Sequence, residues 1–156
     1  MNTEASATPT ASSDVTVRAL EDVDLDDIVR IDELITGHYR PDTWEERVTY
    51  YLRRNPDGAL VAESEGEVVG FMLGDIRGGE FGLDELTGWI EVLGVDPGHR
   101  GKAIGRHLAT TMFTHFQTEG AQVVRTMVDE TMDGIERFFL SLGFAPAPLK
   151  PFVKRL

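Results

Sequence analysis

The chain has 156 residues, 41% of them hydrophobic, and a formal net charge of -12 at pH 7. This length supports one compact core rather than two ordinary domains. The acidic balance argues against nucleic acid or anionic lipid as a partner and favours a cationic one, although the same charge also serves solubility. No apolar run reaches the roughly eighteen residues of a membrane span, and the absence of cysteine excludes disulfides and thiolate metal sites.

Residues 1–14 differ from the rest of the chain in composition. They are rich in Ser, Thr and Ala, and they lack both the basic start and the apolar centre of a secretory signal. Such a composition is typical of a disordered tail. We therefore expect a folded domain over residues 15–156 and a cytoplasmic location.

Alternating apolar and polar positions predict a first strand over residues 15–20. The next apolar positions recur at helical spacing, which predicts a helix that Asp24 caps and Gly37 ends. A shorter helix is expected over residues 43–53, because the sequence Asn-Pro-Asp-Gly at 55–58 then breaks the pattern.

A run of strand-like segments follows these two helices. Residues 59–64 and 68–77 lie on either side of a Glu65-Gly66 turn, which predicts a β-hairpin. A flexible acidic connection over residues 78–88 leads to an apolar strand over residues 89–95.

The second half of the chain alternates helix and strand. Apolar residues recur every four positions along a helix that ends near Gly120, and a short strand follows over residues 123–128. The spacing over residues 135–142 predicts a last helix with Gly143 as its left-handed cap, and residues 152–153 offer a final short strand. Antiparallel strands followed by a strand-helix-strand unit predict a mixed sheet with helices on its faces, an α+β fold of the α/β sandwich type.

The most informative segment, residues 95–106, joins the end of a strand to the start of a helix. It reads Val-Asp-Pro-Gly-His-Arg-Gly-Lys-Ala-Ile-Gly-Arg and gathers Arg100, Lys102 and Arg106 in an otherwise acidic chain. A helix start offers unpaired amide groups and the positive end of a dipole, and glycine lets an anion approach the backbone, so the segment suits a diphosphate. A solvated basic turn is the alternative interpretation. The glycine spacing fits neither a P-loop nor the dinucleotide fingerprint.

This segment resembles the CoA-binding motif of the GNAT superfamily of N-acetyltransferases, Arg/Gln-x-x-Gly-x-Gly/Ala, which Val-Asp-Pro usually precedes. Arg100, Ala103 and Gly105 occupy the three motif positions. Ala103 departs from the usual glycine, a change that is tolerable if the residue is already helical. The resemblance extends to residues 15–35 and to residues 135–144, which are similar to the family's opening elements and to its last helix.

The resemblance implies an N-acetyltransferase domain over residues 15–156 that uses acetyl-CoA as its co-substrate and needs no metal. It also implies a mixed, mostly antiparallel sheet of six to seven strands flanked by about four helices. In such proteins the pantetheine arm lies where two central strands, here residues 89–95 and 123–128, splay apart. The cofactor contacts that the resemblance implies are Leu93, Gly94, Val95, Arg100, Gly101, Lys102, Ala103, Ile104, Gly105, Arg106 and Phe139.

Glu91 is the candidate general base. An acceptor ammonium with a reference pKa of about 10.4 must lose a proton before its nitrogen can attack a thioester. Glu91 interrupts an apolar strand, lies on the same face as Trp89, Leu93 and Val95 by strand alternation, and matches an acidic residue of many relatives. We expect burial to raise its pKa. A structural carboxylate that only satisfies backbone donors is the alternative.

The residue expected to protonate the leaving thiolate is missing. Many relatives place a tyrosine where this chain has Phe139, and phenylalanine cannot donate a proton. A thiol has a reference pKa of about 8.5, so its anion can leave near neutrality with help from water. Tyr39 or Tyr51 could instead supply the proton, although both are also explained as packing aromatics.

The family's acceptor site is formed by the loop after the first helix and by the loop between the third and fourth strands. Tyr39, Glu80 and Asp84 are therefore candidate substrate-binding residues, and the two carboxylates would attract a cation. The leading hypothesis is acetylation of a protein lysine or an N-terminal amine. Acetylation of a small amine and a non-catalytic acyl-CoA sensor are the alternatives, and a homodimer is left open.

Overall fold

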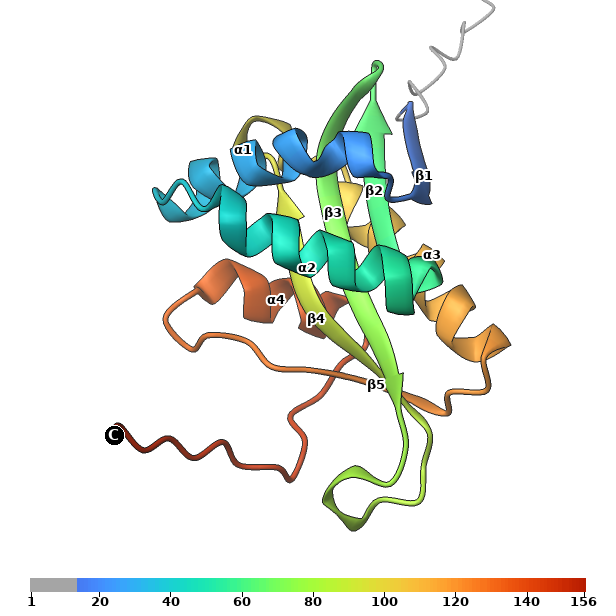
Figure 1. Ribbon diagram of the computed structural model, residues 1–156. Coiled ribbons are helices and arrows are strands. Elements are labelled where there is room, and N and C mark those ends of the chain that lie inside the picture. Colours follow the sequence, from blue (N-terminus) through green and yellow to red (C-terminus); the bar gives the residue numbers. More distant parts are fainter. Residues whose placement is uncertain (1–13) are drawn as a thin grey trace, which may run out of the picture. The chain divides into compact units, whose positions relative to one another are not determined.

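A computed structural model describes residues 14–156 of the chain (Figure 1). The expected N-terminal tail, except for Asp14, lies outside the described residues. The chain divides into two compact units, Met1–Thr126 and Met127–Leu156, and each is described by itself.

The first unit contains a five-stranded sheet in the order β1-β2-β3-β4-β5. Its strands are β1 (Val15–Ala19), β2 (Ala59–Ser64), β3 (Glu67–Arg77), β4 (Thr87–Val95) and β5 (Val123–Thr126). The first four pair antiparallel in sequence order, and β5 joins β4 in parallel. The predicted hairpin is β2-β3 with its turn at Glu65 and Gly66, so the mixed and mostly antiparallel sheet is confirmed.

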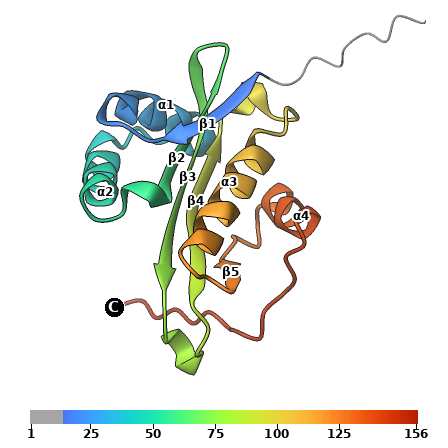
Figure 2. The same cartoon turned by 90° about the vertical axis from the view of Figure 1, so that its right-hand side faces the viewer.

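Three helices cover the two faces of this sheet. They are α1 (Leu25–Thr36), α2 (Pro41–Arg54) and α3 (Ile104–Thr118). Figures 1 and 2 show α1 and α2 on one face and α3 on the other. Short 3-10 turns link the elements at Asp22–Asp24, Pro56–Gly58, Glu80–Gly82 and Pro97–His99. The helix α2 begins two residues before the expected start because proline is well suited to the first position of a helix.

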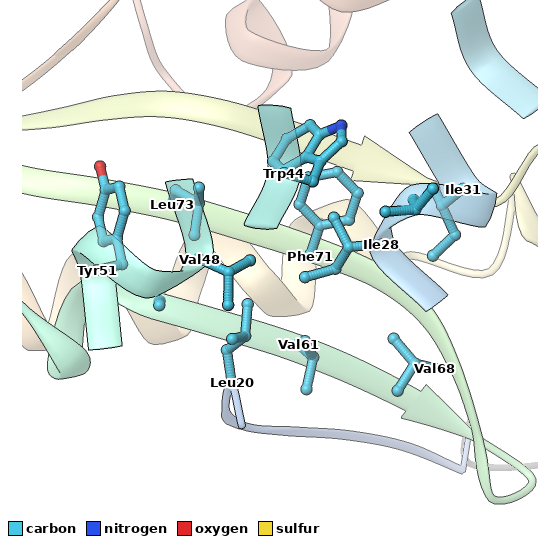
Figure 3. Packing of buried hydrophobic residues seen from close by; sticks show 12 residues of the cluster. Leu20, Ile28, Ile31, Trp44, Val48, Tyr51, Val61, Val68, Phe71 and Leu73 are labelled. Atoms are coloured by element: carbon cyan, nitrogen blue, oxygen red, sulfur yellow. The ribbon is translucent and has the colours of Figure 1, made fainter. Parts of the chain in front are cut away.

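The main hydrophobic cluster lies between the sheet and the two helices α1 and α2 (Figure 3). Ile28 and Ile31 of α1 are fully buried, and Trp44 of α2 meets Phe71 of β3 edge to face at 5.1 Å between ring centroids. Burying such large apolar side chains stabilises each by about 1.5–3 kcal/mol relative to leaving it exposed. This packing fixes α2 against the centre of the sheet, where Tyr51 completes the cluster.

On the opposite face, glycines allow α3 to lie close to the strands. A Cβ atom added to Gly88 would lie 2.3 Å from the ring of Phe116, and one added to Gly74 would lie 2.7 Å from the same ring. Neither distance is compatible with a side chain, so these positions hold α3 at short range over β3 and β4.

The start of α1 differs from the expectation in one respect. Asp24 is the residue before the helix, but its carboxylate does not cap α1. It accepts two hydrogen bonds from Arg18, both at 2.8 Å, and one from the amide of Glu21. The end of the helix is as expected, because Gly37 has a left-handed backbone with φ of 76°.

The second unit contains the helix α4 (Asp133–Ser141). The ring of Phe139 contacts Phe138 and Phe144, with centroids 5.1 and 5.0 Å away, and Gly143 takes the left-handed conformation expected of it.

The expected final strand is wrong. Phe152 and Val153 are 91% and 93% exposed and belong to no strand. Three prolines, Pro146, Pro148 and Pro151, precede them and cannot donate to a strand ladder. The sheet therefore has five strands within residues 14–156 rather than six to seven. Across those residues no helix is long and apolar enough to cross a membrane.

Candidate active site

The strand β4 carries a bulge at Glu91. Leu73 of β3 faces Val92, and the next residue, Gly74, faces Ile90, so Glu91 has no counterpart in β3. An extra residue of this kind bends a strand and changes the direction of its side chains. The only charged side chain in the apolar part of β4 therefore stands at an irregularity of the backbone.

The bulge reverses the alternation of faces along β4. Before it, the missing side chain of Gly88 would point at Phe116 of α3, whereas after it that of Gly94 would point at Phe71 on the other face. A regular strand would send both in the same direction because they are six residues apart. Glu91 and Val92 consequently both face the side of α1 and α2.

The expected grouping of Glu91 is therefore wrong in part. Glu91 shares a face with Trp89, because Arg77 contacts both side chains. Leu93 and Val95 lie on the opposite face, since Val95 pairs with Gly70, whose missing side chain would point at Ile104 of α3. Two cofactor candidates thus project away from the candidate base.

Glu91 is held by two donors from different elements. The hydroxyl of Tyr51 in α2 donates to its Oε2 atom, and Nη2 of Arg77 at the end of β3 donates to its Oε1 atom. The side chain of Glu91 is 30% exposed, so the expected burial is not observed. The carboxylate is oriented by specific partners and remains partly open to water.

Arg77 is a site residue that the sequence analysis missed. Its guanidinium also lies 3.7 Å from carboxylate oxygens of Asp75 and Glu80, and 5.9 Å from the ring centre of Trp89. The sequence contains one indication of this role. Arg77 lies two residues after Asp75, a spacing that predicts that both side chains share one face of β3. Among its partners, Glu80 was expected at the acceptor site, and Arg77 connects it to Glu91.

Tyr51 is almost completely buried, with 2% of its surface exposed. Burial, together with the hydrogen bond to Glu91 and the charge of that carboxylate, raises the pKa of Tyr51 far above its usual value of about 10. Its hydroxyl therefore stays protonated at physiological pH and acts as a donor to Glu91.

The edge of β4 next to β5 opens at the same place. Parallel pairing runs from Thr87 to Ile90 in β4 and ends where Ile90 faces Thr126. From Glu91 to Val95, the backbone groups on this edge have no partner in β5. Binding of the pantetheine arm along this edge, where the two strands were expected to splay apart, stays a prediction.

The loop before α3 is organised around Asp96. One oxygen of its carboxylate accepts the amide of Gly98 at 2.9 Å, and the other lies 3.2 Å from Nη1 of Arg30 in α1. Arg30 also donates to the carbonyl oxygen of Val68 at 3.0 Å. Burial raises the pKa of Asp96, but the Gly98 amide and Arg30 outweigh it, so the pKa is lowered. Arg30 is a second residue that the sequence analysis missed.

Ala103 does not have the helical conformation in which alanine was expected to be tolerable. It precedes α3 with a left-handed backbone, φ 60° and ψ 22°, and is therefore not yet helical. Gly101 is also left-handed, with φ of 84°. The usual glycine of the motif suits this position because a left-handed residue with a Cβ atom is strained.

The other cofactor candidates differ in what they can offer. Arg100, Gly101, Lys102, Ala103 and Arg106 are exposed around the start of α3. Ile104 is buried, with 2% of its surface exposed, so its side chain cannot meet a ligand, and Gly105 is partly exposed. Phe139 belongs to the second unit, so its contact with a cofactor stays a prediction.

The acceptor candidates lie at the surface. Tyr39 is 69% exposed and Asp84 is also exposed, whereas Glu80 is linked to Glu91 through Arg77. The role of Tyr39 and Asp84 stays a prediction. Across residues 14–156, no three His, Asp or Glu side chains are grouped to hold a metal ion.

A family model described as the acetyltransferase (GNAT) family matches residues 25–144. Mycothiol acetyltransferase of Thermobispora bispora is 36% identical over 90 residues, which cover 58% of this chain and 30% of that protein. An acetyltransferase of Pectobacterium atrosepticum is 30% identical over 105 residues, covering 67% of this chain and 70% of the relative. The chain thus spans about 30% of the length of the mycothiol acetyltransferase that it matches.

Solved structures share the fold. The aminoglycoside N-acetyltransferase AAC(6')-Iy in complex with CoA has a TM-score of 0.79 at 15% identity, covering 90% of this chain and 94% of that one. An aminoglycoside acetyltransferase from an uncultured soil metagenomic sample, in complex with sisomicin, has a TM-score of 0.71 at 20% identity, covering 92% and 97%.

Proposed function

This chain belongs to the acetyltransferase (GNAT) family, and on that premise we propose that it transfers the acetyl group of acetyl-CoA to the amine of a small cationic molecule. The predicted family is confirmed, and the use of acetyl-CoA by a domain over residues 15–156 is part of this proposal. The strongest support for catalysis is the bulge that places Glu91, held by Tyr51 and Arg77, at the point where β4 parts from β5.

The start of α3 would hold the diphosphate of acetyl-CoA. The first amides of a helix have no partner within the helix, and the positive end of its dipole attracts an anion. Arg100 and Lys102 add exposed positive charge beside this helix start. The unpaired edge of β4 from Glu91 to Val95 would bind the pantetheine arm by its backbone groups.

Glu91 would act as the general base. It accepts a proton from the acceptor ammonium, whose reference pKa is about 10.4, and the free amine then attacks the thioester carbonyl. The new C–N bond forms and the C–S bond breaks, so CoA leaves as a thiolate. The nitrogen loses its second proton to water, and the thiolate takes up a proton from water. This assignment needs no proton donor at position 139, where the chain has phenylalanine. It is consistent with a thiol pKa of about 8.5, because the thiolate can then leave near neutrality.

A cationic acceptor is favoured by the charges around Glu91. Asp75, Glu80 and Glu91 surround one guanidinium, that of Arg77, which leaves this cluster with more negative than positive charge. A small molecule is favoured over the protein amine that the sequence analysis preferred, because mycothiol and aminoglycoside acetyltransferases are among the similar proteins.

The experiment is to follow release of free CoA thiol from acetyl-CoA with a panel of acceptors. We expect turnover with aminoglycosides, amino sugars or polyamines at a kcat/KM at least about tenfold above that for lysine peptides and N-terminal peptides. A preference for peptides would restore the protein-amine hypothesis. Binding of acetyl-CoA without transfer to any acceptor would favour the acyl-CoA sensor.

A further inference from the structure

Glu91 and Tyr51 are 40 residues apart in the sequence and come from different elements. Tyr51 lies on the buried side of α2, and Figure 3 shows its ring at the edge of the hydrophobic cluster with the hydroxyl pointing out of it. Glu91 stands at the bulge of β4 and is partly exposed. A donor anchored in the core thus meets a partly exposed side chain.

The second donor, Arg77, makes this contact important. A guanidinium prefers to bind both oxygens of a carboxylate in a two-pronged pair. Here Arg77 binds Oε1 while Tyr51 binds Oε2, so the carboxylate is shared between two donors. Without the hydroxyl, Oε2 could turn to Arg77, and both oxygens would be engaged by the same cation.

We propose that Tyr51 is a positioning residue for Glu91, whose buried hydroxyl keeps one carboxylate oxygen away from Arg77 and directed at the acceptor amine. This inference rests on the proposed function, and it assigns Tyr51 a role other than the proton donor considered from the sequence. The hydroxyl already donates its hydrogen bond to Glu91, and the raised pKa of Tyr51 makes it a poor acid.

The first test compares two tyrosine variants with the wild type. Tyr51→Phe should lower kcat by about 10-fold to 100-fold, the effect of losing one hydrogen bond to a charged group, and leave the KM for acetyl-CoA unchanged. Tyr50→Phe is the matched control, because Tyr50 is the neighbouring tyrosine and is 56% exposed.

The decisive comparison uses Glu91→Gln as the second background. If Tyr51 acts only through Glu91, then adding Tyr51→Phe to Glu91→Gln should cause no further loss of kcat, because the effects of coupled residues do not add. An equal loss in both backgrounds, or a loss that appears only in the KM for acetyl-CoA, would overturn the inference in favour of a merely structural tyrosine.

A second measurement does not depend on activity. The chain labelled with 3-fluorotyrosine should give a fluorine resonance for Tyr51, assigned by its loss in Tyr51→Phe, and Glu91→Gln should move that resonance alone. Resonances of Tyr39 and Tyr50 serve as internal controls. An unmoved Tyr51 resonance overturns the inference even in an active enzyme. Absence of acetyl transfer by the wild type would instead contradict the proposed function, and the spectrum would still decide the Tyr51 contact.

Discussion

On the proposed function, Ala103 would determine how closely the loop before α3 can approach the diphosphate of acetyl-CoA. Its left-handed backbone, with φ of 60°, is a conformation that costs a residue with a Cβ atom about 1–2 kcal/mol. Its exposed methyl group also lies beside the amides that begin α3. The chain therefore carries strain at the position where glycine would carry none.

We predict that Ala103→Gly raises the free energy of unfolding by up to about 1 kcal/mol and tightens binding of CoA, because strain is removed while some unfolded-state entropy is gained. Gly101→Ala is the matched control and should lower the free energy of unfolding, since Gly101 has φ of 84° and open space around it. Urea denaturation and calorimetry measure the two effects. Weaker CoA binding by Ala103→Gly would show that the methyl group contributes to the site.

The identity of Glu91 could be predicted from the sequence, but its orientation could not. A single acidic residue in an apolar strand is visible as a pattern, whereas the bulge depends on the pairing of Leu73 and Gly74 with β4. Strand alternation therefore placed Leu93 and Val95 on the wrong face. The sequence also could not predict that Arg77 and Tyr51 both bind Glu91, because this contact depends on how β3, β4 and α2 pack together.

Among the elements, α1 is connected by Arg30 to the loop before α3. This residue donates to Asp96 at 3.2 Å and to the carbonyl of Val68 at 3.0 Å, so it links α1 to the loop before α3 and to the start of β3. Asp96 in turn closes the turn by accepting the amide of Gly98. The loop is held from outside itself, by an element that the sequence motif does not contain.

We predict that Arg30→Met raises the KM for acetyl-CoA about 3-fold to 10-fold and changes kcat by less than 2-fold, because an arginine hydrogen-bonded to a carboxylate contributes about 1 kcal/mol when it is partly exposed. Arg53→Met, in the exposed last turn of α2, is the control. Steady-state kinetics with varied acetyl-CoA measures both parameters. A fall in kcat at constant KM would place the role of Arg30 elsewhere.

Most elements follow from short patterns, and the exceptions have local causes. The β2-β3 hairpin, the end of α1 at Gly37 and the start of α3 all agree with their sequence signals. The strand expected at residues 152–153 fails because apolar character alone does not provide a neighbour to pair with, and three preceding prolines remove donors. Local signals thus predict elements well and predict sheet membership less well.

At the scale of the whole molecule, stability should depend on a set of buried or partly buried carboxylates. Asp24, Asp32 and Asp96 all have lowered pKa values. For Asp24, burial raises the pKa, but hydrogen bonds from Arg18 and from the amide of Glu21 outweigh it. A carboxyl whose pKa is lower in the folded state stabilises the fold above its unfolded pKa of about 3.9, and this contribution is lost as pH falls.

We predict that the free energy of unfolding decreases as pH is lowered from about 4 toward 2, and that Arg18→Met makes this decrease shallower. Arg18 supplies two of the hydrogen bonds that keep Asp24 charged, so its removal lowers stability at pH 7 more than at pH 2. Urea denaturation across this range measures the difference. Parallel curves for the two proteins would contradict the assigned role of Arg18.

The whole chain combines a helix start suited to a diphosphate, an open strand edge and a positioned carboxylate. We propose that these parts form a catalytic acetyltransferase site with Glu91 as its base. The most direct test is the rate of CoA thiol release with the best acceptor amine, for the wild type and for Glu91→Gln at saturating acetyl-CoA. The account predicts a loss of about 10²-fold or more in Glu91→Gln with unchanged affinity for CoA. Equal rates in the two proteins would contradict it.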